Sequence, residues 1–117
     1  MSPVKRDYIL YLSDMFLSMQ RINKYISEID FETFSQSDIV LDAVIRNLEI
    51  IGEAAKKIPF EVQEKYPEMP WSKMYSLRNL IAHEYFAVDI EMIWELAKNR
   101  LPQNCSDLER IIKSETI

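Results

Sequence analysis

The first determinant of the fold is residues 8–29, which read YILYLSDMFLSMQRINKYISEI. Large apolar side chains recur in this stretch at alternating spacings of four and three residues: Tyr8, Leu12, Met15, Met19, Ile22, Ile26 and Ile29. That spacing puts them on one side of an α-helix. Ser2 and Pro3 suit a helix start, with a capping side chain before a proline at the first helical position. The pattern predicts one long amphipathic helix that ends near Asp30.

A second helix is predicted from about Ser37 to Ile58, after a polar break at residues 31–37 and before Pro59. Its apolar side carries Val40, Val44, Leu48, Ile51, Ala55 and Ile58. Its opposite side carries the charged or polar residues Asp42, Arg46, Glu49, Glu53 and Lys57. A charged side of this kind is usually solvated.

Three positions in this helix carry further information. Gly52 in mid-helix costs about 1 kcal/mol relative to alanine, so it predicts a close backbone approach. Asn47 lies at the edge of the apolar side, where a buried amide needs hydrogen-bond partners and a structural role is favoured. Glu53 and Lys57 are spaced for an ion pair within the helix.

The second half of the chain predicts a short helix over residues 60–66 and a third long helix from Pro70 or Trp71. The core-facing positions of the third helix are Met74, Leu77 and Ile81. Asp89 is placed to cap a fourth helix, which Pro102 should kink or end. The apolar pattern continues past Pro102, so this broken helix should reach about Ser114.

Composition narrows the class of protein. A chain of 117 residues with 48% hydrophobic residues predicts one packed domain over residues 1–117. A single glycine leaves little for hairpin turns, and a single cysteine, Cys105, excludes an internal disulfide. The expected fold is all-α, an up-and-down helical bundle of four to five helices. No apolar run approaches membrane-spanning length and the N-terminus lacks a signal-peptide pattern, so we expect a soluble cytoplasmic protein.

Residues 78–85 read RNLIAHEY and hold the only histidine, His83. In a helix, Asn79 and His83 share one side, whereas Arg78 and Tyr85 share the neighbouring one. A cation beside a group that titrates near neutrality suits the handling of a phosphate ester. A lone histidine in a helix is equally compatible with a structural or solvated role, and Tyr85 with a packing role at a helix end.

This segment resembles the R-x-x-x-x-H-x-Y motif of the HEPN superfamily, and within it the HepT-like toxin family. Residues 46–57, RNLEIIGEAAKK, resemble the helix of that family with a Gly-Glu-Ala signature. Trp71 and residues 89–94 also fall where family members place similar residues. The two blocks in this order are fairly specific, and the resemblance covers the chain from about Asp7 to Leu108.

The resemblance implies a HEPN-like helical domain with metal-independent ribonuclease activity at a homodimer cleft. RNA supplies its own nucleophile, the 2′-hydroxyl, so the protein needs only a proton carrier and a cation. His83 fits the first role and Arg78 the second, with Asn79 orienting the imidazole or donating to the phosphate. No cofactor is expected, and one histidine without a carboxylate cluster offers no good metal site. Further candidates for lining the site are Arg46, Glu49, Glu53 and Ser76.

The resemblance also implies a partner protein and a way in which the activity is regulated. HepT-like toxins are similar in having the motif tyrosine, here Tyr85, adenylylated by an MNT-type nucleotidyltransferase antitoxin. The net charge of −5 argues against tight RNA binding and less strongly against catalysis. A catalytically inactive HEPN-like module that binds a partner or a nucleotide therefore remains an alternative. A plain dimerising bundle is a third alternative, which leaves the polar motif unexplained.

Overall fold

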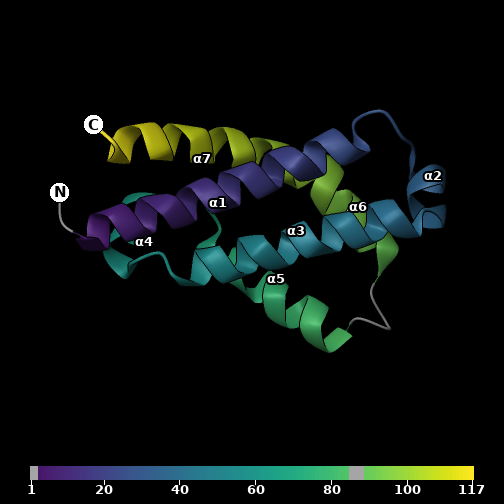
Figure 1. Cartoon of the computed structure of the whole chain (residues 1–117), viewed down its shortest axis with the longest axis horizontal. Coiled ribbons are helices and arrows are strands. Elements are labelled where there is room, and N and C mark those ends of the chain that lie inside the picture. The colour runs from purple at the N-terminus through teal and green to yellow at the C-terminus, as the bar shows by residue number, and fades with distance from the viewer. Residues whose placement is uncertain (1–2, 85–88) are drawn as a thin grey trace.

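The computed structural model describes residues 3–84 and 89–117, and the side chains of residues 7–78 and 89–117. The described backbone is helical, without a strand, which confirms the predicted all-α class. Four long helices form the body: α1 (Pro3–Ile26), α3 (Asp38–Lys56), α5 (Trp71–Glu84) and α7 (Leu101–Glu115). In Figure 1, α1 lies between α7 and α3, and α5 packs on the far side of α3. This arrangement matches the predicted helical bundle.

The core forms where the apolar sides of these helices meet. Helix α1 buries the apolar positions that the four-and-three spacing predicts within it, and α3 buries Leu48, Ile51 and Ala55. The buried positions of α1 are Tyr8, Leu12, Met15, Met19, Ile22 and Ile26. Leu108 and Ile111 of α7 close the same core from the other side of α1. The amphipathic patterns predicted from the sequence are therefore the surfaces that pack.

The first helix is shorter than predicted, and the polar break after it is partly helical. Helix α1 ends at Ile26 rather than near Asp30, and residues predicted as a break form the short helix α2 (Phe31–Gln36). The cause is local, because the Asp30 carboxylate accepts a hydrogen bond of 2.8 Å from the Thr33 amide and caps α2. The predicted cap at Ser2 lies outside the described residues.

The second and third helices begin and end close to where the sequence predicts. Ser37 caps α3 by accepting a hydrogen bond of 3.2 Å from the Val40 amide. The predicted short helix is α4 (Phe60–Lys65), and α5 starts at Trp71 as expected. The Trp71 indole donates to the Tyr66 carbonyl at 3.0 Å, which ties the start of α5 to the end of α4. Ile81, predicted on the core side of α5, lies outside the described side chains.

The last helix is broken in an unexpected way. Asp89 caps α6 (Ile90–Glu95), as predicted, and α6 continues directly into the π-helix η2 (Leu96–Arg100) and then α7. The Leu101 amide donates to the Leu96 carbonyl five residues back. Pro102 has no amide hydrogen and its ring crowds the preceding turn of an α-helix. The wider π turn just before the proline accommodates it, and the helical backbone continues through Pro102 to Glu115, close to the predicted end near Ser114.

A buried carboxylate fastens the end of α7. Glu115 is 6% exposed and accepts hydrogen bonds from the Tyr8 hydroxyl at 2.6 Å and the Tyr66 hydroxyl at 2.5 Å. Lys65 adds an ion pair at 3.3 Å. These bonds join α7 to the start of α1 and the end of α4, near one end of the bundle (Figure 1).

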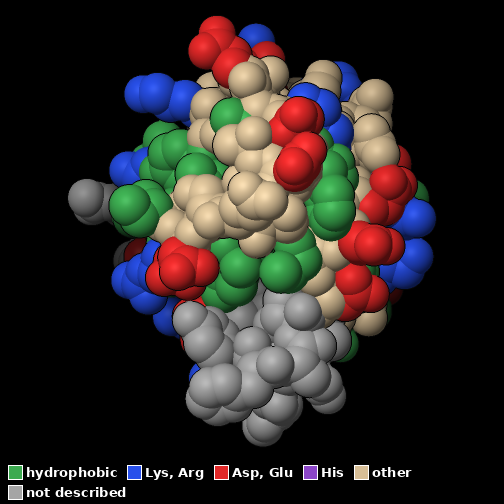
Figure 2. Space-filling view, turned by 90° about the vertical axis from the view of Figure 1, so that its right-hand side faces the viewer, with side chains coloured by type: hydrophobic (Ala, Val, Ile, Leu, Met, Phe, Trp, Pro, Cys, Tyr) green, Lys and Arg blue, Asp and Glu red, His purple; other side chains and the backbone are tan. Residues whose placement is uncertain are grey.

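The surface is mixed in character. At the end of the molecule where α2 and α6 lie, acidic and basic side chains stand in separate small groups between hydrophobic ones (Figure 2). Each helix in the described part of the chain is too short or too polar to cross a membrane.

Candidate functional site

The candidate site is built where α3 and α5 cross. A Cβ atom placed on Gly52 of α3 would lie 2.8 Å from the backbone nitrogen of Arg78 in α5 and 3.0 Å from its Cβ. Real Cβ atoms essentially never approach a backbone atom so closely, so only glycine fits at this crossing. The close approach predicted for Gly52 is confirmed. Its partner is the first residue of the RNLIAHEY motif.

The residue after this glycine holds the Arg78 side chain. The Arg78 Nε atom lies 2.5 Å from the Glu53 Oε1 atom, and the two side chains are 45% and 49% exposed. At this exposure the ion pair contributes at most about 1 kcal/mol to stability. Its main effect is geometric, because a bond at Nε limits how the guanidinium can rotate.

The ion pair predicted between Glu53 and Lys57 is not formed. Glu53 turns across to α5, and the Lys57 ammonium lies 5.0 Å from the centre of the Tyr11 ring on α1. A cation over a ring face is attracted by the ring quadrupole. Glu53 and Lys57 therefore each interact with a residue of a neighbouring helix instead of with each other.

A cavity of about 270 Å³ lies between α1 and α3 beside this ion pair. Three of the four predicted lining candidates, Arg46, Glu49 and Glu53, line it together with Tyr11, Asp14 and Lys57. The fourth, Ser76, does not line it. Its hydroxyl donates to the Lys73 carbonyl at 2.9 Å along the exposed part of α5. The sides of the cavity therefore carry both signs of charge.

Two further residues of the motif lie on the backbone of α5. Helix α5 includes positions 79 and 83, so Asn79 and His83 are one helical turn apart on the backbone. Their side chains, and Tyr85 altogether, lie outside the described residues. Arg78, Gly52 and Glu53 form the described part of the site.

The Asn47 side chain makes a hydrogen bond within its own helix, as predicted, and also has a buried oxygen atom. It is 5% exposed, and its amide nitrogen donates to the Ala43 carbonyl at 2.9 Å. The Oδ1 atom is buried and accepts no hydrogen bond from the described part of the chain. The amide anchors its own helix and lies one turn before Ile51 and Gly52.

Sequence patterns did not identify the Glu53–Arg78 pair. The two residues are 25 positions apart, and charged helix sides carry no periodic signal for a distant partner. The available signal was Gly52, which indicates that another backbone comes close. A charged residue next to such a glycine, here Glu53, can reach a side chain on the helix that packs against the glycine.

The chain is similar to a family and to proteins that are named as ribonucleases. Residues 15–114 match the family described as "Ribonuclease HepT-like". The chain is 40% identical over 109 residues to "Putative RNase MJ0125" of Methanocaldococcus jannaschii, a match covering 93% of this chain and 94% of that protein. It is 37% identical over 110 residues to "Probable ribonuclease HepT" of Thermococcus cleftensis, covering 94% and 100% respectively.

A second Methanocaldococcus jannaschii protein, "Putative RNase MJ1216", is 38% identical over 109 residues, covering 93% of this chain and 90% of that protein. No solved structure matches the chain. The family match and these relatives span nearly the whole helical domain, including both sequence blocks at the crossing of α3 and α5. The chain belongs to the HepT-like family of the HEPN superfamily.

Proposed function

We propose that this protein is a metal-independent endoribonuclease toxin of a HEPN/MNT toxin–antitoxin pair. The observation that carries the proposal is the way in which α3 fixes the backbone and the side chain of Arg78. A glycine lets its backbone approach α3, and a carboxylate holds its Nε atom. The relatives named as ribonucleases support the same activity.

The Glu53 bond suits Arg78 to bind phosphate. A guanidinium has five N–H donors, and the Nε group uses one of them on Glu53. The two terminal nitrogens remain to donate to two oxygens of one phosphate. Holding the side chain by Nε lowers the conformational entropy lost on binding, so Glu53 acts as a positioning residue.

His83 and Asn79 complete the proposed chemistry. His83 takes the proton from the 2′-hydroxyl or gives one to the leaving 5′-oxygen, since imidazole titrates near neutrality. Arg78 stabilises the charge that develops on the phosphate, and Asn79 orients the imidazole or donates to the phosphate. The 2′-oxygen attacks phosphorus and the bond to the 5′-oxygen breaks, so no metal-bound nucleophile is needed.

One histidine per chain is too few for an acid and a base in the same step. A two-fold homodimer supplies two copies of Arg78 and His83 to one shared cleft. We expect light scattering to report a dimer at micromolar concentration. A monomer that cleaves RNA at full rate contradicts this part of the proposal.

The proposed partner is an MNT-type nucleotidyltransferase antitoxin that transfers AMP from ATP to Tyr85 and releases pyrophosphate. The added phosphate brings negative charge and bulk close in sequence to Arg78 and His83. It competes with RNA phosphate for the guanidinium, which silences the toxin.

The direct test is cleavage of single-stranded RNA by the purified protein and by two variants. His83→Ala and Arg78→Ala should each lose cleavage by at least about a hundredfold, the usual contribution of acid–base or electrostatic catalysis. Circular dichroism should remain that of the wild type, and cleavage should persist in excess EDTA. Activity that survives either substitution, or that disappears in EDTA and returns with magnesium, contradicts the assignment.

A second candidate function is a HEPN-like module that binds a partner or a nucleotide without cleavage. Two observations favour it: the net charge of −5, and the Arg78 charge already paired with Glu53. This reading predicts that wild-type protein leaves RNA intact under all buffer conditions while still binding its partner.

A further inference from the structure

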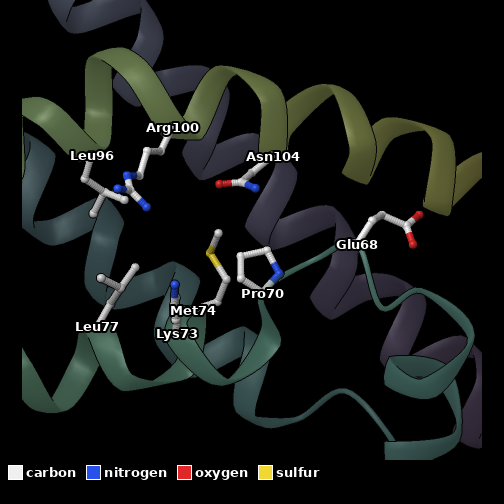
Figure 3. Close-up of a pocket in the computed structure, with 8 residues that line it drawn as sticks. All are labelled: Glu68, Pro70, Lys73, Met74, Leu77, Leu96, Arg100 and Asn104. Carbon is white, nitrogen blue, oxygen red and sulfur yellow. The ribbon is translucent and has the colours of Figure 1, made fainter.

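A second cavity lies on another side of the motif helix. It has a volume of about 320 Å³ and lies between α5 and the η2–α7 segment (Figure 3). That volume is within the range of about 300–1,000 Å³ that is usual for small-ligand sites. It shares no lining residue with the cavity beside Glu53. The first proposed site therefore does not account for it.

Two cations converge on this cavity from opposite walls. Lys73 rises from α5 and Arg100 descends from the end of η2, with the space of the cavity between them (Figure 3). Within the described part of the chain, neither side chain forms an ion pair. Both residues are exposed, so their charges can meet a ligand from solvent. In a chain with net charge −5, two such cations facing each other mark a site for an anion.

The remaining walls suit the rest of a nucleotide. Met74 is buried, and Leu77 and Leu96 are half-buried, so together they form an apolar wall of the kind that lines small-ligand sites and that can cover the face of a base. The half-buried Asn104 side chain points from α7 toward the middle of the cavity (Figure 3). An amide has both donors and an acceptor, which is what the edge of a base requires.

The acidic residue at the cavity lies at its edge and has a cationic partner of its own. Glu68 lies at one end, away from Arg100, and pairs with Arg110 at 3.6 Å. Arg110 also binds Asp107 at 2.7 Å. The unpaired charge at the centre of the cavity is therefore positive.

The backbone supports a built site. Leu96 and Arg100 are the first and last residues of the π-helix, and Asn104 follows one turn later. Turns of π-helix are rare and often occur at functional sites. Here the π turn precedes Pro102 and presents Leu96 and Arg100 toward α5.

We propose that this cavity binds one nucleotide of a single-stranded RNA, with Lys73 and Arg100 on its phosphate and the Met74, Leu77 and Leu96 surface under its base. This inference rests on the proposed ribonuclease function and extends it. Lys73 and Arg78 lie on the same helix, and five residues along an α-helix span about 7.5 Å. The strand that presents its scissile phosphate to Arg78 can therefore continue around α5 into the cavity.

Binding is tested separately from cleavage by using the full chain with His83→Ala. A short fluorescein-labelled single-stranded RNA is titrated at several salt concentrations and followed by fluorescence anisotropy. Lys73→Gln/Arg100→Gln should weaken binding about tenfold at low salt. It should also flatten the plot of log affinity against log salt by about 0.7 for each lost contact.

A matched control separates a local contact from net charge. Arg21→Gln/Lys24→Gln removes the same two charges from exposed positions on α1. It should change the affinity much less than the cavity variant does. Equal losses in both double variants, or no loss in the cavity variant, overturn the site. Because Lys73 and Arg100 are exposed, circular dichroism should show both variants folded.

Photocrosslinking identifies the contact without relying on charge. RNA that contains 4-thiouridine should crosslink to peptides that include residues 73–77 or 96–104, and AMP should compete with it only at high concentration. The RNA assignment is overturned if AMP saturates the cavity through Lys73 and Arg100 and the double variant Lys73→Gln/Arg100→Gln still binds RNA with unchanged affinity. RNA bound through Lys73 and Arg100 by a wild-type protein that never cleaves it overturns the proposed ribonuclease instead and leaves the site standing.

Discussion

Gly52 and Arg78 meet backbone to backbone, and this contact sets the position of the motif helix. An added Cβ at position 52 would lie 2.8 Å from the Arg78 nitrogen and 3.3 Å from its Cα. Both atoms belong to a helix backbone, which cannot move aside as the end of a side chain can. The next residue, Glu53, then reaches the Arg78 guanidinium. A single Gly-Glu pair thus determines where the arginine backbone lies and how its side chain points.

Gly52→Ala should destabilise the protein by about 1–3 kcal/mol, the usual cost of overpacking. At an ordinary helix position the same change stabilises by up to about 1 kcal/mol, so the sign is diagnostic. Urea unfolding measures the difference, with Lys56→Ala at an exposed α3 position as the control. RNA cleavage should also fall, since α5 must shift. A stabilised Gly52→Ala variant with full cleavage contradicts the role assigned to the contact.

Glu53→Gln should reduce RNA cleavage about tenfold while changing the unfolding free energy by less than about 1 kcal/mol, because the pair is half-exposed. The loss should fall mainly on kcat, since a positioning residue acts on the orientation of Arg78 in the transition state. Glu61→Gln, an exposed carboxylate on α4, removes the same charge elsewhere. Faster cleavage by Glu53→Gln would instead mean that the carboxylate restrains Arg78 from reaching RNA.

Glu115→Gln should destabilise the fold by roughly 2 kcal/mol at neutral pH, because it weakens two charge-assisted hydrogen bonds and an ion pair. Burial opposes ionisation of Glu115, but hydrogen bonds from Tyr66, Tyr8 and Lys65 outweigh it and hold the pKa of the carboxyl below its ordinary value of 4.5. A depressed pKa stabilises the folded state above the unfolded pKa, and that stabilisation is lost as the pH falls through the folded pKa. The difference between wild type and Glu115→Gln should therefore be constant above about pH 5.5 and shrink below pH 4.5.

The two tyrosines provide a check on the same cluster. Burial, followed by the hydrogen bond to Glu115, raises the pKa of Tyr8 to about 12. The Glu115→Gln variant should lower the pKa of Tyr8, which ultraviolet titration of phenolate detects. Two results together would contradict the coupling of α1, α4 and α7 through Glu115. They are a Tyr8 pKa that does not change in the variant, and an unfolding free energy that depends on acidic pH as it does in the wild type.

Tyr85→Phe should stay folded and remain active in RNA cleavage, yet resist silencing by the proposed MNT-type partner with ATP. The substitution removes the acceptor oxygen and keeps the ring. Intact-mass spectrometry should show the mass of AMP on the wild type and none on the variant. AMP found on another residue, or inhibition that persists in the variant without any modification, would make occlusion by the partner the better explanation.

Several features of this protein follow from local patterns in its sequence. The alternating spacing of four and three residues from Tyr8 to Ile26 defines the buried side of α1, because burial requires apolar atoms at helical period. Ser37 and Asp89 mark helix starts, since their side chains satisfy amides of the next turn. Gly52 indicates a close approach, and the RNLIAHEY motif with the Gly-Glu-Ala helix indicates the family.

Other features were decided only by the tertiary structure. The partner of Glu53 is Arg78 rather than Lys57, and the Tyr8 hydroxyl finds Glu115, 107 residues away. Lys73 and Arg100 come to face one cavity because α5 packs alongside η2 and α7. The physical reason is common to all three. Apolar burial imposes a period on the chain that can be read locally, whereas a charged or polar side chain accepts any partner of suitable chemistry. Which partner it meets depends on how the helices are placed in space.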